Sequence, residues 1–367
     1  MALVAHEVSG EQGSGRVVRE LVLRARDRVD FVVVARELAE ELSALVEWRR
    51  VRAPASPYRT KLAVFFALGA IEVARARADL VHLHTIGPLV PNRCDLNSVH
   101  FIRAGFFEAA GIFGPDGLPR LRRLSPRAHL AFERWCDRRA RLLAAVSEGS
   151  KRDLERFFPG VPVVVTPNGV DAERFSPDPA AREELRRAEG VGQDDVVALV
   201  VANSWSQKGV GVAIEALATA PGRLWVVGYG DAERYGARAA QAGVAERVRF
   251  FGTQTDVAPF YRAADVFLLP SLYEQASLAA CEAAASGLPL VVTPVSGMEE
   301  LVGAEEGGLF VERNPVAVAQ ALSRLAEDGA LRARMGEAAR RRAVELTWER
   351  SVESILAAYE RLLGRPL

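Results

Sequence analysis

Residues 270–289 read PSLYEQASLAACEAAASGLP, and this stretch decides how the rest of the sequence is interpreted. The apolar run that ends at Pro270 predicts a strand, and a helix is expected to begin near Ser277 and end at Gly287. Where a strand leads into a helix through small residues, free backbone N–H groups and the helix dipole point out of the sheet edge. Such amides suit a diphosphate.

Two carboxylates accompany these amides. Glu274 lies in the expected loop, and Glu282 lies between alanines inside the expected helix. A charge in a small apolar helix that packs on a sheet needs a partner. A carboxylate accepts paired hydrogen bonds and therefore suits a ribose diol or sugar hydroxyls. The alternative is that both are ordinary solvated charges. We favour ligand binding.

Short apolar runs alternate with amphipathic segments along the whole chain. The runs lack polar alternation, which is typical of parallel strands covered on both faces, and the helical segments between them complete a βαβ rhythm. The expected strands are 2–5, 31–34, 79–84, 97–100, 142–146 and 163–166, followed by 196–202, 224–228, 248–251, 266–270, 290–293 and 308–311.

Turn-forming residues at 167–171 interrupt this rhythm once. A chain of 367 residues exceeds what one hydrophobic core usually supports. We therefore predict an α/β protein with two Rossmann-like domains, 1–167 and 168–347. Residues 348–364 are expected to form a C-terminal helix that could pack back on the first domain.

Net charge, cysteine content and the length of apolar runs limit which classes of function fit the chain. The chain has 47 Lys plus Arg and 47 Asp plus Glu, so no overall positive electrostatic field favours the binding of nucleic acid. Three cysteines at wide spacing form neither a disulfide framework nor a zinc site and fit a reducing compartment. No apolar run is long enough to cross a bilayer, and we expect no secretory signal. These features predict a cytoplasmic protein.

Charge is concentrated locally between residues 120 and 141. Eight arginines in this segment face only Glu133 and Asp137, and apolar side chains such as Phe132 and Trp135 interleave with them. One interpretation is a solvated helical face. The other is a peripheral contact with anionic lipid at the inner face of the membrane, or with a lipid-linked acceptor.

The first domain offers weaker signals. Gly13 and Gly15 lie between the first strand and a helix, which permits close backbone approach to a ligand. They do not form a dinucleotide fingerprint, because Val18 occupies the position of the third glycine. His82 and His84 share a strand face, but no third ligand is spaced to complete a metal site, so we favour a structural role.

The Glu-x7-Glu spacing, flanked by Pro270-Ser271 and by 286–292, resembles the donor-site motif of the glycosyltransferase family 4 superfamily. Residues 79–84, 145–148, 167–171, 208–209, 228–230 and 264–271 are similar to further motifs of that superfamily. The resemblance implies the GT-B architecture, with two Rossmann-like domains facing across a cleft, and transfer with retention of anomeric configuration. Residues 201–302 are most similar to the branch of lipopolysaccharide-core glucosyltransferases.

The resemblance also implies roles for individual residues. Glu282 would bind the ribose and Glu274 the transferred sugar, and His100 would lie near that sugar. Lys208 and the amides of residues 276–279 would stabilise the diphosphate, which the loop at residues 13–15 would border. Besides the two glutamates, the donor-binding residues would be Gly13, Gly15, Asn203, Lys208, Gly228, Ala276, Ser277, Leu278 and Ala279. Two positions depart from the pattern, since Asn203 stands where most members have an arginine and Ser277 where many have glycine.

We therefore expect a retaining hexosyltransferase of polysaccharide biosynthesis that uses a nucleotide-diphosphate sugar, with UDP as the expected nucleotide. The acceptor would be a glycan, a lipid-linked molecule or a small molecule. No cofactor or metal is expected, because the chain contains no Asp-x-Asp. A catalytically weakened carbohydrate-binding relative is one alternative, which Asn203 mildly favours. A nucleotide-sugar epimerase is another, but no tyrosine here has a lysine four residues on.

Overall fold

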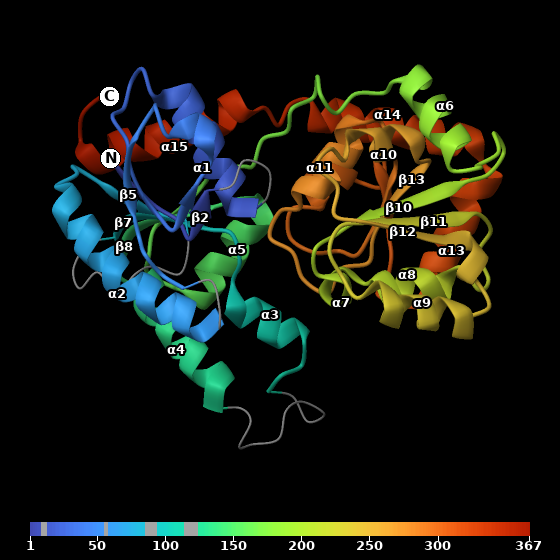
Figure 1. Cartoon of the computed structure of the whole chain (residues 1–367), viewed down its shortest axis with the longest axis horizontal. Coiled ribbons are helices and arrows are strands. Elements are labelled where there is room, and N and C mark those ends of the chain that lie inside the picture. Colours follow the sequence, from blue (N-terminus) through green and yellow to red (C-terminus); the bar gives the residue numbers. More distant parts are fainter. Residues whose placement is uncertain (9–12, 55–57, 85–93, 114–123) are drawn as a thin grey trace. The chain divides into compact units, whose positions relative to one another are not determined.

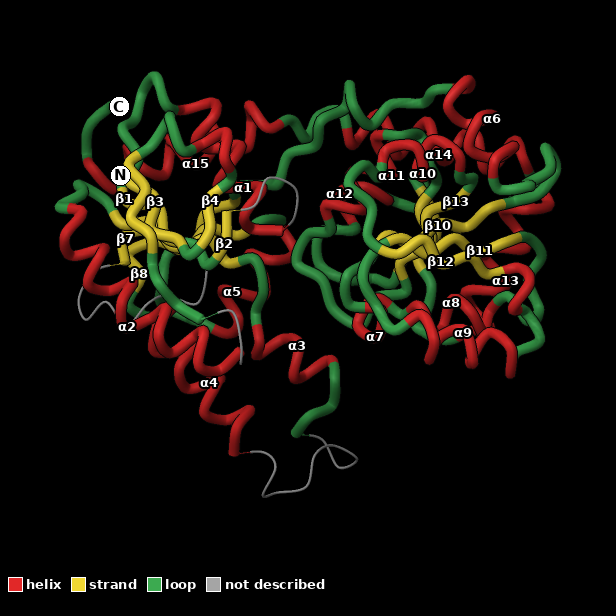
Figure 2. Tube along the Cα trace, viewed as in Figure 1, coloured by secondary structure: helices red, strands yellow, loops and turns green. Residues whose placement is uncertain are grey.

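The computed structural model describes residues 1–8, 13–54, 58–84, 94–113 and 124–367 (Figure 1). These residues form two compact units, of which the first comprises Met1–Asn168 together with Trp348–Leu367 and the second comprises Gly169–Thr347. Each unit contains a parallel sheet with helices on both faces (Figure 2). The expected α/β class is confirmed.

The first unit is built on a sheet of order β5-β3-β1-β6-β7-β8-β9, in which every neighbouring pair is parallel. A short separate ladder pairs β2 with β4. The strands are β1 (Ala2–Val4), β2 (Glu7–Val8), β3 (Val32–Ala35), β4 (Glu37–Leu38), β5 (Glu47–Arg50), β6 (Val81–Leu83), β7 (Cys94–Val99), β8 (Ala140–Ala145) and β9 (Val163–Val165).

Two details of this sheet differ from the sequence-based expectation. Strand β5 was not expected, because its residues Glu-Trp-Arg-Arg carry charges instead of an apolar run. It pairs only with β3 at the edge of the sheet, where charged side chains are tolerated and discourage further pairing. Strand β7 ends at Val99, so His100 lies just beyond it instead of within it.

The helices of the first unit cover both faces of its sheet (Figure 1). They are α1 (Gly13–Ala25), η1 (Glu40–Leu42), α2 (Tyr58–Ala76), α3 (Arg103–Ala109), α4 (Leu124–Asp137), α5 (Glu148–Phe157) and α15 (Trp348–Leu363). The C-terminal helix α15 packs on α1 and β7 and buries an apolar face at helical spacing that includes Trp348, Ile355 and Tyr359. Across the described residues, no helix is both long and apolar enough to cross a membrane.

The second unit has a sheet of order β12-β11-β10-β13-β14-β15, again parallel throughout. Its strands are β10 (Val197–Val201), β11 (Arg223–Val227), β12 (Val248–Gly252), β13 (Val266–Leu269), β14 (Leu290–Val292) and β15 (Gly308–Phe310). All six coincide with predicted apolar runs. The order of the strands reverses between β10 and β13, which is where doubly wound sheets bind ligands at the carboxyl ends of their strands.

Both faces of this second sheet are buried. Helices α10 (Ala258–Ala263), α11 (Leu278–Ala285) and α14 (Gly329–Ala343) cover one face, and α8 (Val210–Ala216), α9 (Ala232–Gln241) and α13 (Pro315–Glu327) cover the other (Figure 2). The remaining elements are α6 (Pro179–Ala188), α7 (Trp205–Lys208), η3 (Ala245–Arg247) and α12 (Glu299–Val302). In the five strands β10, β11, β13, β14 and β15, alternate residues belong to opposite cores, which explains their apolar runs, whereas the edge strand β12 carries the exposed Arg249.

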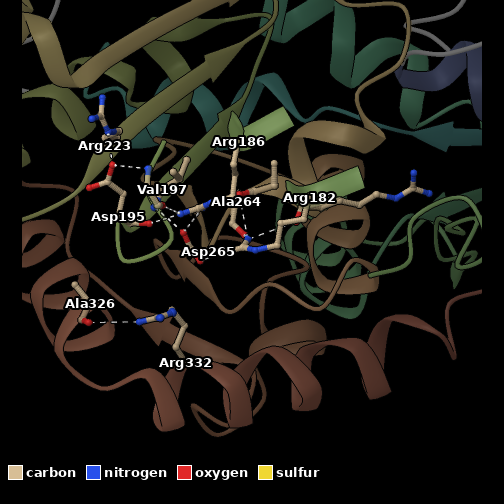
Figure 3. Close-up of polar contacts among 12 residues, drawn as sticks. Arg182, Arg186, Asp195, Val197, Arg223, Ala264, Asp265, Ala326 and Arg332 are labelled. Carbon is tan, nitrogen blue, oxygen red and sulfur yellow. Dashed lines mark hydrogen bonds and ion pairs between the residues drawn. The ribbon is translucent and has the colours of Figure 1, made fainter. Parts of the chain in front are cut away.

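A polar network fastens α6 to the amino-terminal ends of β10 and β13 (Figure 3). The buried Arg186 guanidinium pairs with Asp265 at 3.0 Å and donates to the carbonyl oxygens of Gly192 and Asp195 at 2.7 and 2.6 Å. Arg182 binds the other oxygen of Asp265 at 2.6 Å. The network lies at the end of the sheet opposite to the carboxyl ends of the strands, so its role is structural.

We expect Arg186→Met to lower the free energy of unfolding by about 3–5 kcal/mol, because the substitution leaves the Asp265 carboxylate buried without one of its two arginines. Urea denaturation followed by tryptophan fluorescence measures the change. The neighbouring exposed Arg187, which pairs with Glu183, supplies the matched control. Arg187→Met should change stability by no more than about 0.5 kcal/mol, and equal losses in the two variants would contradict a special role for the network.

Candidate active site

The segment that follows β10 lies close to the end of β13 at Gly209. This residue follows α7 with a φ of 78°, and a Cβ at its position would lie 2.2 Å from the carbonyl oxygen of Pro270. Any side chain would therefore separate the two segments. Because of this contact, Lys208 at the end of α7 lies beside the loop that follows β13.

Lys208 and Glu274 form an ion pair in this position. The ammonium Nζ lies 2.5 Å from Glu274 Oε1, and the Ser271 hydroxyl donates to the same oxygen at 2.6 Å. The Glu274 side chain is buried, whereas that of Lys208 is 20% exposed. In the described structure both hydrogen bonds of this carboxylate go to Oε1, which leaves Oε2 as the oxygen that can accept bonds from a ligand.

The loop that carries Glu274 is held from three sides. The Thr293 hydroxyl donates to the Ser271 carbonyl oxygen at 2.6 Å, and Gly297 approaches the loop so closely that a Cβ would lie 2.8 Å from the Gln275 carbonyl oxygen. Arg313 donates to the carbonyl oxygens of Pro270 at 3.1 Å and Ser206 at 2.9 Å. Sequence reasoning missed Arg313, although its place directly after a predicted strand could have indicated it.

Helix α11 begins at the end of this loop, as predicted. Ser277 is its N-cap, and the Ser277 hydroxyl accepts a hydrogen bond from the Ala280 N–H at 3.3 Å. None of the described hydrogen bonds uses the N–H groups of residues 276–279. The first N–H groups of a helix have no partner inside it, so these four amides can bind an anion.

Glu282 has the partner that its apolar helix requires. Its carboxylate is buried and accepts a hydrogen bond from the hydroxyl of Tyr261 in α10, at 2.9 Å. Tyr261 lies 21 residues earlier in the chain and was not predicted as part of the site. The interpretation of Glu282 as a solvated surface charge is therefore wrong.

Asn203 and Gly228 lie at the carboxyl ends of β10 and β11. A Cβ on Gly228 would lie 2.2 Å from the Ala202 carbonyl oxygen, so the turn after β11 requires glycine. The Asn203 side-chain oxygen accepts a hydrogen bond from the Tyr229 N–H at 3.3 Å. At the position where the resemblance implied an arginine, this chain thus has an amide that supports the neighbouring turn.

In the first unit, three histidines lie together, namely His82, His84 and His100. His82 lies between the hydroxyls of Tyr359 and Ser98, at 2.7 and 2.8 Å from its two ring nitrogens. His84 Nδ1 lies 3.2 Å from His100 Nε2. Burial lowers the pKa of His100 to about 4 and that of His82 to about 3, so both rings are neutral at pH 7.

The other predicted elements of the first unit are only partly described. Gly13 is the first residue of α1, with a φ of 57°, and Gly15 is buried in the same helix, whereas residues 9–12 lie outside the described residues. Residues 120–123 of the basic segment also lie outside them. No three His, Cys, Asp or Glu side chains among the described residues are grouped as a metal site.

The basic segment has an uneven surface. Its two acidic side chains are buried, because Glu133 accepts from the Arg103 and Ala104 N–H groups at 2.6 and 3.1 Å and Asp137 accepts from the Asn97 amide at 2.6 Å. The described arginines of the segment are all exposed, namely Arg127, Arg134, Arg138, Arg139 and Arg141. The charge count from the sequence subtracted the two acidic residues from the arginines. Because both acidic side chains are buried, the solvent-exposed surface of the segment is more basic than that net charge indicates.

Comparison with known proteins identifies the family. Residues 12–174 match the profile described as Glycosyltransferase Family 4, and residues 181–342 match the profile described as Glycosyl transferases group 1. A D-inositol 3-phosphate glycosyltransferase of Salinispora arenicola is 30% identical over 328 residues, which cover 80% of this chain and 72% of the relative. An uncharacterized glycosyltransferase of Methanocaldococcus jannaschii is 26% identical and covers 94% of this chain and 93% of its own length.

Solved structures share the fold over nearly the whole chain. WaaG, a glycosyltransferase involved in lipopolysaccharide biosynthesis, has a TM-score of 0.81 at 22% identity, with 96% of this chain and 98% of WaaG covered. HepE of Anabaena, solved with UDP and glucose, has a TM-score of 0.78 at 19% identity, with 98% of each chain covered. The chain therefore belongs to the family 4 glycosyltransferases, and its two parallel-sheet units have the GT-B architecture.

Proposed function

We propose that this glycosyltransferase is a retaining, metal-independent hexosyltransferase that takes its sugar from a nucleotide-diphosphate donor, with UDP as the nucleotide. The observation that carries the proposal is the amino end of α11, where four amides without described partners lie beside the Lys208–Glu274 pair and Glu282 follows inside the helix. A nucleotide sugar presents a diol, a diphosphate and a hexose in that order, and the second unit offers a carboxylate, cationic groups and a second carboxylate.

Each group has a distinct chemical task in this proposal. Glu282 accepts hydrogen bonds from the ribose hydroxyls, and Glu274 accepts them from the transferred sugar. The Lys208 ammonium and the amides of residues 276–279 stabilise the negative charge that grows on the departing diphosphate, which is usually the largest contribution to such catalysis. Protein groups thus supply the positive potential that a metal ion provides in other sugar transferases.

The engagement of the carboxylates bears only on the route to retention, because it argues against a double displacement, which would also retain the anomeric configuration. A double displacement needs a carboxylate close to the anomeric carbon on the face opposite the leaving group. Glu282 is bound to Tyr261, and Glu274 is bound to Lys208 and Ser271, so neither is an obvious nucleophile. We propose a loose, oxocarbenium-like transition state in which the acceptor attacks on the leaving-group face, a diphosphate oxygen takes the acceptor proton, and His100 orients the sugar.

The acceptor belongs to the same proposal. A glycan, a lipid-linked molecule or a small polyol is compatible with this chemistry. Because several similar proteins carry the name D-inositol 3-phosphate glycosyltransferase, inositol phosphate is a sensible first acceptor to test.

We expect Glu282→Gln to weaken UDP binding about tenfold or more, because hydrogen bonds to a charged group contribute about 1.5–3 kcal/mol. Isothermal titration calorimetry without divalent metal measures the change. Inorganic pyrophosphate, which lacks the ribose, should bind both proteins equally. The matched control is Tyr261→Phe, which removes the helix-side hydrogen bond of Glu282 but keeps its carboxylate. If Glu282→Gln binds UDP as tightly as the unchanged protein does, Glu282 does not hold the ribose.

We expect an α-linked donor to give an α-linked product in the presence of EDTA, because no metal step is proposed and the acceptor attacks on the leaving-group face. The anomeric proton coupling of fresh product in NMR reports the configuration. An inverted product would contradict the mechanism, and loss of turnover with EDTA would contradict metal independence. Donor binding without turnover on any acceptor would favour a weakened carbohydrate-binding relative instead.

A peripheral contact with anionic membrane forms a second part of the proposal. Helix α4 and the residues after it expose arginines, while Glu133 and Asp137 are buried. Leu124 is 64% exposed and Trp135 is 37% exposed, so apolar side chains accompany the cationic ones. The Arg139 guanidinium lies 4.7 Å from the centre of the Trp135 ring. Basic and amphipathic surfaces of this kind bind anionic lipid at the headgroup level.

We expect the protein to sediment with vesicles that contain phosphatidylserine and to be released by salt, since each basic residue near such a surface contributes about 1 kcal/mol. Replacing Arg127, Arg134 and Arg138 by glutamine should weaken this binding at least tenfold. The control variant replaces three exposed arginines of the second unit, Arg187, Arg334 and Arg341, with the same change in net charge. Equal effects of the two variants, or sedimentation that ignores salt, would leave α4 as an ordinary solvated helix.

A further inference from the structure

Three histidines of the first unit occupy a repeating arrangement at the carboxyl ends of the neighbouring parallel strands β6 and β7. His82 on β6 and His84 just beyond its end lie two residues apart, and each contacts the residue 16 positions later on or just beyond β7, namely Ser98 and His100. The rings of His82 and His84 are 4.0 Å apart, centre to centre. The two pairs therefore form adjacent rungs of one ladder.

The two pairs differ in how many of their histidine ring nitrogens have hydrogen-bond partners. Both ring nitrogens of His82 have hydroxyl partners, one from Ser98 and one from Tyr359 of α15. His84 Nδ1 faces His100 Nε2, but His84 Nε2 is buried without a hydrogen-bond partner among the described residues. His84 is 3% exposed, whereas His100 is only half-buried.

The protonation of the second rung follows from this difference. Burial lowers the pKa of both rings, so each is neutral at pH 7 and carries one proton. Between His84 Nδ1 and His100 Nε2, one nitrogen must donate and the other must accept.

If His100 Nε2 donates, the proton of His84 lies on its Nε2 atom, where a buried N–H has no described acceptor. If His84 Nδ1 donates, every N–H of the pair is either bonded or on the half-buried ring, and only a lone pair stays unused. Buried N–H groups without a partner are the rarer defect in proteins, as surveys of backbone groups show.

We infer that His84 is a positioning residue that holds His100 as the tautomer protonated on Nδ1. His100 then presents an N–H donor from Nδ1, and its Nε2 lone pair is occupied by His84. In this state His100 can donate to an oxygen of the sugar or of the departing phosphate, but its Nε2 atom cannot take the proton of an attacking acceptor. The catalytic meaning of this tautomer rests on the proposed function, whereas the tautomer itself does not.

The tautomer is measured on the ligand-free protein at pH 7 by two-bond ¹H–¹⁵N correlation of ¹⁵N-histidine NMR. The chain has five histidines, and the His100 signals are assigned by their loss in His100→Asn. We expect the Nδ1-protonated pattern for His100 and a neutral ring. A pattern protonated on Nε2 would overturn the inference, because His84 would then accept and not donate.

Substitution of His84 separates its role from simple packing. An asparagine amide can offer an N–H near the place of Nδ1, so His84→Asn should keep the Nδ1-protonated pattern of His100. His84→Leu removes this donor, so His100 should no longer be held in that tautomer. We expect His84→Leu to lower kcat about tenfold with the donor KM changed less than twofold, and His84→Asn to restore most of kcat. The control is Tyr359→Phe, which removes a hydrogen bond from His82 but none from the His84–His100 pair.

The outcomes distinguish this inference from the proposed function. If His100→Ala lowers kcat but His84→Leu does not, the positioning role fails while the proposed function stands. If the tautomer is as inferred but His100→Ala leaves kcat unchanged, the role of His100 in the proposed function fails while the assignment of the pair stands. If Tyr359→Phe lowers kcat and shifts the His100 signals as much as His84→Leu does, the effect is general packing and the inference is overturned.

Discussion

The contact between Gly209 and the carbonyl oxygen of Pro270 is the constraint on which the site of the second unit depends. It allows the end of α7 to reach the end of β13 and so places the Lys208 ammonium against the Glu274 carboxylate, which lies 66 residues further along the chain. Since β10 and β13 flank the point at which the strand order reverses, the same contact fixes the side chains at the place where a doubly wound sheet binds its ligand. Arg313 stabilises this arrangement by joining the two segments through their carbonyl oxygens.

The Lys208–Glu274 pair couples two parts of the proposed ligand. A diphosphate that approaches Lys208 competes with Glu274 for the ammonium, and separating a largely buried pair leaves the other charge uncompensated. A sugar hydroxyl that donates to Glu274 compensates that carboxylate. Under the proposed function, the complete nucleotide sugar therefore satisfies both charges, whereas free nucleotide satisfies only Lys208. Asn203 accepts from the Tyr229 N–H, so under the same proposal Lys208 and the amides at the start of α11 would carry more of the stabilisation of the diphosphate than they would beside an arginine.

The sequence predicted those features that depend on local pattern and failed where partners come from distant segments. Strands β10, β11, β13 and β14 were found because both of their faces are buried, and β5 was missed because an edge strand needs no apolar run. The need of Glu282 for a partner could be argued from its apolar helix, but the identity of Tyr261 could not, because it depends on how α10 packs against α11. For the same reason, charge counting treated Glu133 as a neighbour of the surface arginines, although its carboxylate binds the first N–H groups of α3.

The return of the C-terminal helix to the first unit connects the end of the chain with the histidine ladder. The Tyr359 hydroxyl of α15 is one of the two partners of His82, and without it a buried ring nitrogen would lose its hydrogen bond at a cost of about 1–3 kcal/mol. The His82 ring packs against His84, whose Nδ1 faces His100. A helix that is distant in sequence thus supplies one polar partner that the strands alone do not provide. Because His82 packs against His84, this hydrogen bond helps to fix where the rings of the cluster lie, whereas the protons of the second pair depend on the contact between His84 and His100.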